Sequence, residues 1–174
     1  MTDCGTALTD GLVQGVAAAL EQKRPWMLSS LADEFGVTEK AVAEVLPEGM
    51  CAFTGGENFI RVWEALGEWE AATFIMQHEG NVVEVRGRIP KGTSGHGYYN
   101  LSENEALGGH LRADAVTDMA FLSMSFMGLE SHSVQFFNAE GHVVFSVYAG
   151  RENHRIIPSV KVSFLHLRRE MTGV

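Results

Sequence analysis

The spacing of apolar residues divides the chain into a helical first part and a strand-rich second part. Apolar positions three and four residues apart predict helices over 11–22, from Ser29 or Ser30 to Phe35, and over 39–46 and 59–70. Short apolar runs between turn residues predict strands over 73–76, 82–89, 98–101, 109–115, 119–125, 134–137 and 142–148. Pro158 suits the first turn of a closing helix over 159–171. We therefore expect an α+β fold, with N-terminal helices, a largely antiparallel sheet and a C-terminal helix.

Local signals place some of the element boundaries. Thr38 can cap the third helix, and Pro47 ends it. The Gly-rich stretch 47–58 predicts a loop. We expect one domain, in which 1–70 is the helical N-terminal part and 71–174 holds the sheet and the closing helix.

The stretch from Trp26 to Leu46 has the helix, glycine-containing turn and helix of a helix-turn-helix. A DNA reader needs Arg, Lys, Asn or Gln on its second helix, whereas this helix offers Lys40 between Glu39 and Glu44. The chain has 13 Lys and Arg against 22 Asp and Glu, and its formal net charge of -9 argues against binding to nucleic acid or an anionic membrane. A structural helical hairpin is favoured, and a DNA-binding regulator is the alternative.

The composition is that of an ordinary globular protein, because 174 residues with 45% hydrophobic side chains can bury a sizeable core. Cys4 and Cys51 belong to no CxxC pair, so we expect reduced thiols and no disulfide framework. The N-terminus lacks the basic residues of a signal peptide, and no apolar run approaches the roughly 18 residues of a membrane span. These features predict a cytoplasmic protein.

The motifs of common enzymes are not found in the sequence. The segment from Gly92 to His96 is no nucleophile elbow, because GxSxG would need glycine where His96 stands. The segment from Gly95 to Asn100 lacks the third glycine of GxGxxG, and there is no P-loop or HExxH motif. We therefore do not expect an enzyme with a recognisable catalytic motif, although a triad or carboxylate pair whose members meet only in space would leave none in the sequence.

Histidines are the most suggestive residues for ligand chemistry. Of the 7 histidines, those in the strand-rich part are His78, His96, His110, His132 and His142. Neutral imidazole is a good ligand for iron, zinc or copper, and its Nε2 is the common axial donor to haem. His110 follows Gly108 and Gly109, where a flat macrocycle could approach the backbone, and strand alternation places Arg112 on the same face. The pattern suits iron ligation by His110 with a cation nearby, and it equally suits a tight hairpin turn at Gly108-Gly109 with Arg112 as a solvated charge.

His96, Tyr98 and Asn100 likewise share one face of a predicted strand, with Tyr99 on the other face. A tyrosinate can ligate ferric haem. The methionines and phenylalanines of the strand region suit either a pocket for a large planar ligand or an ordinary core: Met119, Met124, Met127, Phe121, Phe126, Phe136, Phe137 and Phe145.

Several sequence blocks, in a fixed order, carry a resemblance to a known family. They are Ile89-Pro90-Lys91-Gly92, His96-Gly97-Tyr98-Tyr99-Asn100-Leu101, Gly108-Gly109-His110-Leu111, Phe126-Met127-Gly128-Leu129, Phe136-Phe137-Asn138-Ala139-Glu140-Gly141 and Gly150-Arg151-Glu152-Asn153-His154-Arg155. From about Glu68 to Arg169 the chain resembles the ChuX/HutX group of bacterial intracellular haem-utilisation proteins. The helical part through Trp63 also looks like that family's.

The resemblance implies a fold related to one half of the larger cytosolic haem-trafficking or haem-degrading proteins, usually assembled as a homodimer. It also implies non-covalent binding of imported haem and its delivery to a haem-degrading enzyme. The helix-turn-helix layout would then be scaffold and not a DNA reader.

The resemblance implies some haem ligands more directly than others. The histidine of the family's Gly-Gly-His block matches His110, whereas a second histidine proposed in some members falls on Gln77, one position before His78. A one-residue offset in a strand reverses the face. The second axial position would therefore be held by His78, Tyr98, His96 or water.

We hypothesise reversible haem binding in an apolar cleft on the sheet, with His110 as the leading iron ligand and Tyr98 or His96 assisting. Arg112 or Lys91 would lie near the propionates. Replaceable ligands without a CxxCH attachment site suit a carrier. The alternatives are an enzyme that acts on haem through the cofactor's own reactivity and, more weakly, a zinc-binding protein, since no ligand pair has metal-site spacing.

Overall fold

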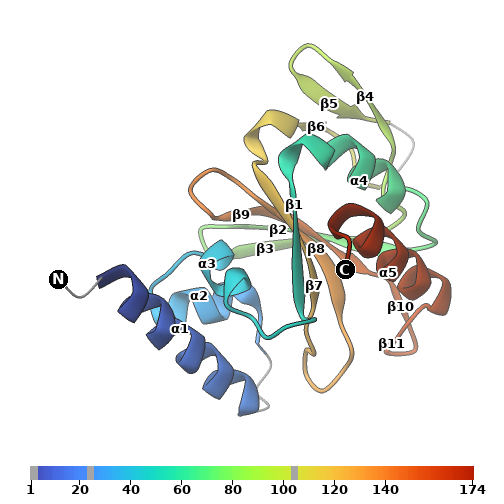
Figure 1. Ribbon diagram of the computed structural model, residues 1–174. Coiled ribbons are helices and arrows are strands. Elements are labelled where there is room, and N and C mark those ends of the chain that lie inside the picture. The colour runs from blue at the N-terminus through green and yellow to red at the C-terminus, as the bar shows by residue number, and fades with distance from the viewer. Residues whose placement is uncertain (1–3, 23–25, 103–105) are drawn as a thin grey trace.

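The computed structural model describes residues 4–22, 26–102 and 106–174, and its elements follow the predicted order (Figure 1). The helices are α1 (Cys4–Glu21), α2 (Leu28–Phe35), α3 (Glu39–Glu44), α4 (Phe59–Leu66) and α5 (Pro158–Thr172). The N-terminal helices, the antiparallel strands and the closing helix confirm the predicted α+β class.

Within the described residues, a 6-stranded antiparallel sheet has the strand order β1-β7-β8-β9-β2-β3. Its strands are β1 (Cys51–Gly55), β2 (Ala72–His78), β3 (Asn81–Gly87), β7 (Asp118–Ser123), β8 (His132–Phe137) and β9 (Val143–Ala149). A small sheet of β4 (Gly92–Gly95), β5 (Tyr98–Leu101) and β6 (His110–Leu111) lies at the top of Figure 1. A short hairpin of β10 (Arg151–Glu152) and β11 (Arg155–Ile156) precedes α5.

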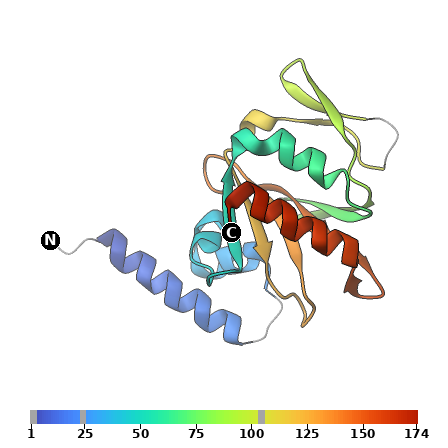
Figure 2. The same cartoon turned by 45° about the vertical axis from the view of Figure 1, so that its right-hand side comes forward.

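Each face of the main sheet has its own core, because successive side chains of a strand point to opposite faces. On one face the sheet packs against α4 and α5, which Figure 2 shows on the same side, around Trp63, Trp69, Phe121, Phe136 and Phe164. On the other face the N-terminal helices bury Val16, Leu31 and Val42 against Leu122 and Phe137. The strand residues fully buried in this second core come from β7 and β8, so part of the face formed by β2, β3 and β9 stays open for a ligand.

The local signals account for some boundaries and not for others. Thr38 caps α3 as predicted, since its hydroxyl oxygen accepts a hydrogen bond from the Ala41 amide at 3.3 Å. Gly36 ends α2 in the left-handed conformation, with φ 64°. The predicted start of α2 at Ser29 or Ser30 is late by one or two residues, because the helix begins at Leu28 without a side-chain cap.

Two predicted segments are wrong in detail. The predicted loop 47–58 contains β1, which pairs with β7 from Cys51 opposite Leu122 to Gly55 opposite Asp118. The predicted strand 109–115 is reduced to β6 and is followed by a 3-10 turn, Ala113–Ala115. In both cases distant partners decide the strand, and local composition does not reveal them.

The helix-turn-helix segment is part of the packed fold. Lys40 of α3 forms an ion pair with Asp118 at 2.7 Å, and Glu39 contacts the His142 ring at 3.0 Å. Val42 is fully buried, and the Lys40 amide donates to the Gly141 carbonyl. These contacts fit a scaffold, because the only cation of the second helix is already engaged with the sheet.

Candidate functional site

The small sheet brings His110 of β6 together with Tyr98 and Asn100 of β5, which share one face of their strand as predicted. Asn100 lies opposite His110 in the ladder, and its Oδ1 is 2.7 Å from the His110 Nδ1. The Asn100 amide nitrogen donates to the carbonyls of Thr93 and Gly95, both at 3.1 Å, which fixes the amide with its oxygen toward the ring. An amide oxygen can only accept, so Nδ1 carries the proton and Nε2 keeps a free lone pair. This is the tautomer of an Nε2 metal ligand.

The two neighbouring tyrosines point to opposite faces. The Tyr98 ring lies 5.8 Å from the His110 ring, centroid to centroid, and is 43% exposed. Tyr99 is 2% exposed, packs edge-on against Phe59, and its hydroxyl oxygen accepts a hydrogen bond from the Gly92 amide. Tyr98 is therefore accessible to a ligand, and Tyr99 belongs to the core.

The other candidates on this side are exposed. His96 lies in the β4–β5 turn with φ 55°. Lys91 forms an ion pair with Glu68. Arg112 is 2.7 Å from the Asp114 carboxylate, and its hydrogen bond holds the pKa of that carboxyl below the ordinary value. Each of these two cations already has a carboxylate partner that an incoming anion would have to replace.

His78 and Gln77 lie at the end of β2. Gln77 lines a small pocket of about 60 Å³ on the face of β2 that also carries Ile75. His78 is exposed, and strand alternation directs it to the opposite face. The one-residue difference between Gln77 and His78 therefore places their side chains on opposite faces of β2.

A larger cleft, of about 560 Å³, opens on the same face of the main sheet as Gln77. Thr73, Ile75, Ser133 and Tyr148 form its floor, and the segment entering α2 forms one wall with Trp26, Met27 and Leu28. The β7–β8 connection adds Met124, Phe126, Met127 and Leu129. The charged residues at the cleft are Glu84, Arg86 and Arg151, and its histidine is His154. This volume and this mostly apolar lining are typical of sites for small molecules and cofactors.

The floor is held by buried polar groups. The Gln135 amide donates to the Ser133 hydroxyl at 2.8 Å and lies 3.4 Å from the Tyr148 hydroxyl. Burial raises the pKa of Tyr148, so its phenol stays protonated. The floor is thus neutral and hydrogen-bonded.

Glu130 anchors the wall formed by the β7–β8 connection. Its carboxylate accepts from Lys161 of α5 at 2.7 Å and from the His132 Nε2 at 3.0 Å, and its carbonyl accepts from Arg151. The His132 ring stacks on Phe164 at 4.7 Å. Because the Glu130 carboxylate can only accept, Nε2 of His132 carries the ring proton. Nδ1 therefore accepts a hydrogen bond from the Ser123 hydroxyl at 2.9 Å. These are the residue types of a hydrolytic triad, but none of the three lines the cleft.

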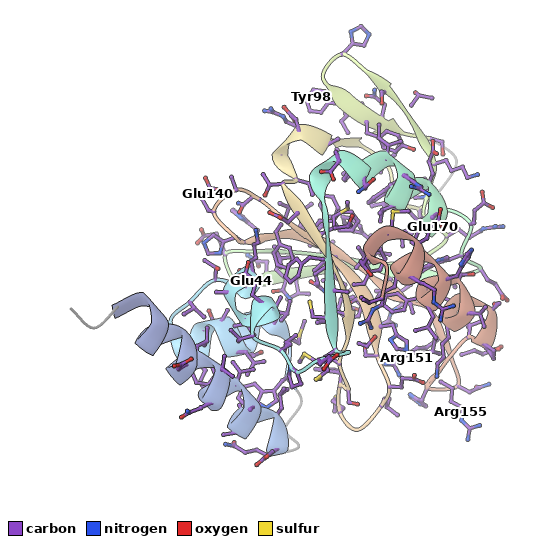
Figure 3. All side chains as sticks on the ribbon, in the orientation of Figure 1. Glu44, Tyr98, Glu140, Arg151, Arg155 and Glu170 are labelled. Atoms are coloured by element: carbon purple, nitrogen blue, oxygen red, sulfur yellow. The ribbon has the colours of Figure 1, made fainter. Side chains whose placement is uncertain are left out.

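The cleft and the sequence-derived site are separate places on one chain. None of the candidates on the small sheet, nor His78, lines the cleft. In Figure 3, Tyr98 lies near the top of the molecule and Arg151 near the bottom. In the described part of the chain no three His, Cys, Asp or Glu side chains come together as a metal site. No helix in that part is both long and apolar enough to cross a membrane.

Sequence reasoning missed the residues that surround the cleft, above all Trp26, Arg86, Arg151 and His154. A signal for some of them was present, because two of the blocks that carry the family resemblance, 126–129 and 150–155, contribute Phe126, Met127, Leu129, Arg151 and His154. Their common place in space becomes visible only when the sheet is assembled.

The fold and the cleft define an α+β protein with a site of cofactor size. Comparison with known proteins makes this specific, because the family model described as haem utilisation ChuX/HutX matches residues 52–166. The chain belongs to the ChuX/HutX haem-utilisation family, as its sequence blocks indicated.

Individual relatives cover most of the chain. It is 36% identical over 163 residues to the intracellular heme transport protein HutX of Vibrio cholerae, a match that spans 92% of this chain and 84% of the relative. The structure of the heme-binding protein ChuX matches with a TM-score of 0.78 and 29% identity, over 89% of this chain and 97% of that chain. A protein from Erwinia carotovora matches with a TM-score of 0.83 and 33% identity, over 90% and 98% of the two chains.

A more distant match confirms the predicted relation to a larger fold. Apo-PhuS, a heme-binding protein from Pseudomonas aeruginosa, matches with a TM-score of 0.73 and 11% identity. The match covers 94% of this chain but only 46% of PhuS, so this chain has the fold of about half of that protein.

Proposed function

We propose that this protein binds haem non-covalently in the 560 Å³ cleft and carries it within the cytoplasm to a haem-degrading enzyme, as part of iron acquisition. The cleft is the observation that supports this most strongly. Trp26, Phe126 and Met127 offer the flat and soft apolar surfaces that suit a planar macrocycle. Family membership and the names of the relatives supply the identity of the ligand.

Two arginines at the cleft suit the propionates of haem. Arg86 lies 2.9 Å from Glu84 in an exposed ion pair, which a ligand carboxylate can replace at little cost. Among the described residues, the Arg151 guanidinium donates to the backbone carbonyls of Glu130 and His154 and has no carboxylate partner. The propionate partners we now propose are therefore Arg86 and Arg151, with Arg112 and Lys91 as the candidates only if haem lies on the small sheet.

Thiolate ligation by Cys51 and covalent attachment through a CxxCH motif do not fit the proposed site. Cys51 lies on β1, outside the cleft, and burial raises the pKa of its thiol to about 12. The thiol therefore stays protonated at neutral pH. With no CxxCH motif in the sequence, haem would be held by packing, ion pairs and exchangeable iron ligands, as a carrier requires.

His110 remains a proposed iron ligand, with Tyr98 beside it, in an arrangement that needs a homodimer. Within one chain His110 does not reach the cleft, yet its Nε2 is free and its ring is oriented by Asn100. We propose that the small sheet of one subunit faces the cleft of the other. Exposed Met76, Val82 and Val83 on the neighbouring β2–β3 hairpin would pack against the second copy.

The alternatives have less support. As a DNA-binding regulator the protein would need a free recognition helix, whereas Lys40 of α3 is paired with Asp118. An enzyme acting on haem would rely on the cofactor's own reactivity, and no observation at the described cleft favours such a reaction over reversible binding. We propose a carrier without catalytic activity.

Haemin titration tests the proposal. We expect a Soret shift that saturates at one haem per chain, and at least about tenfold weaker binding in Thr73→Trp, which fills the floor of the cleft. Val162→Trp is the control, because it adds the same side chain to an exposed position on α5, outside the cleft. The absence of a Soret shift in the wild type would refute haem binding. Equal affinity in Thr73→Trp would refute the cleft as the binding site.

Mixed dimers test the arrangement of subunits. A Thr73→Trp subunit has a blocked cleft and an intact His110, whereas a His110→Ala subunit has the reverse. If His110 serves the cleft of the other subunit, the mixed dimer regains one wild-type site. If mixing restores no such site, the cross-subunit arrangement is wrong, and haem binding by the cleft is judged by the titration alone.

A further inference from the structure

The β10–β11 hairpin places a histidine at the cleft in an unusual way. Arg151 pairs with Ile156 and Glu152 with Arg155, so the turn consists of Asn153 and His154, with φ 49° and 64°. Such two-residue turns need positive φ at both positions and favour Asn followed by Gly. Asn153 fits this rule, but His154 stands where glycine would be the easier residue. The geometry of the turn therefore does not explain why a histidine occupies position 154.

The hairpin is anchored to the wall of the cleft. The Arg151 guanidinium donates to the His154 carbonyl at 3.2 Å and to the Glu130 carbonyl. Glu130 is held in turn by Lys161 of α5 and by the buried His132. His154 thus lies on a turn that hydrogen bonds attach to the rest of the protein, so its backbone holds a fixed position at the cleft.

The ring of His154 has no hydrogen-bond or ion-pair partner among the described residues. The hydrogen bond from Arg151 reaches the backbone carbonyl of His154 and not its ring. The contrast with the neighbouring His132 is clear, because both ring nitrogens of His132 are engaged. An exposed imidazole with both nitrogens free, at an apolar cleft, is available to bind a metal ion.

Other donors at the cleft are less suitable for iron. The phenol of Tyr148 stays protonated because burial raises its pKa. Met124 is 6% exposed and packed in the second core, and Met127 is 69% exposed at the tip of its turn. Glu84 is paired with Arg86. Of these groups, His154 is the imidazole, which is the common axial donor to haem iron, and its backbone is anchored.

We propose that His154 is the iron ligand that each subunit supplies to its own cleft, an inference that rests on the proposed haem binding. One imidazole nitrogen donates its lone pair to the iron, and the other nitrogen keeps its proton. No bond within haem or protein is broken. His110 of a second copy of the chain would be a further protein donor to the same haem.

His154→Gly tests this with little risk to the fold, since it creates the Asn-Gly turn that such hairpins favour. We expect the ferric and ferrous spectra of the haem complex to lose the imidazole-ligated signature and haem dissociation to speed up about tenfold or more, as at other weakened metal sites. Free imidazole should restore the spectrum. Glu79→Gly is the matched turn control, because Glu79 also has positive φ, 50°, in the two-residue β2–β3 turn. His166→Ala controls for the loss of a histidine, because His166 is an exposed residue of α5.

The outcomes separate the inference from the function. If the wild type binds haem and His154→Gly keeps its spectrum and dissociation rate, His154 is not a ligand, and haem binding still stands. A similar spectral change in Glu79→Gly or His166→Ala would also overturn the assignment, because the effect would not be specific to His154. If the wild type shows no Soret shift at all, the proposed function itself fails.

Discussion

Replacing Glu130 by Ala should destabilise the wall of the cleft more than any change at its exposed partner. The substitution removes the acceptor of the His132 Nε2 proton, and the His132 side chain is only 7% exposed. A buried donor without a partner costs about 1–3 kcal/mol. The Lys161 ion pair, with side chains 41% and 51% exposed, adds about 0–1 kcal/mol. The expected loss is therefore about 1–4 kcal/mol, most of it from the buried imidazole.

Two further variants separate the two contributions. Glu130→Gln keeps an amide oxygen that can accept from His132 and loses only the charge, so we expect a cost of about 0–1 kcal/mol. Lys161→Met removes the ion pair and leaves His132 satisfied, with a similar small cost. Urea unfolding, followed by the fluorescence of buried Trp63 and Trp69, measures all three.

The order of these costs is the test. If Lys161→Met destabilises as much as Glu130→Ala, the exposed ion pair dominates and the argument from the buried imidazole is wrong. Because 126–129 belongs to the same connection and lines the cleft, Glu130→Ala should also release haem faster than Lys161→Met.

Burial holds the pKa of His132 below its ordinary value. As the pH falls through about 6.5, the imidazole is therefore protonated in the unfolded chain but stays neutral in the folded chain. The free energy of unfolding should fall as the pH drops below about 6.5, and urea unfolding of His132→Gln between about pH 7 and 5 should show a flatter slope. An equal slope would contradict this. Thr38→Ala should lose about 1 kcal/mol in the same assay by removing the cap of α3, and no change would mean that the cap is dispensable. Trp63→Phe removes the indole donor to the Pro90 carbonyl, a 2.8 Å bond, and should cost at least about 1 kcal/mol; a neutral result would show that the carbonyl finds another partner.

The fold was predictable where the signal is local. The apolar spacing of Phe59, Val62, Trp63 and Leu66 identifies α4, and each of these side chains is buried. β4 was missed because Gly-Thr-Ser-Gly has no apolar alternation, and it is a strand only through its pairing with β5. Pairing of this kind depends on distant residues, which one sequence does not reveal.

The candidate site was predictable only in part. Alternation correctly placed Tyr98 and Asn100 on one face, but the Asn100 amide that orients His110 comes from cross-strand pairing. The cleft draws on residues as distant as Trp26 and His154, which no spacing rule connects. His154 in particular reads as part of a hairpin turn, and its relevance to a ligand depends on where the assembled fold puts that turn.

A crystal structure of the haem complex tests the central claim most directly. We predict the macrocycle in the cleft, between the wall carrying Trp26 and the one carrying Phe126, with its propionates at Arg86 and Arg151. Haem bound to the small sheet around His110 with the cleft empty would contradict the claim.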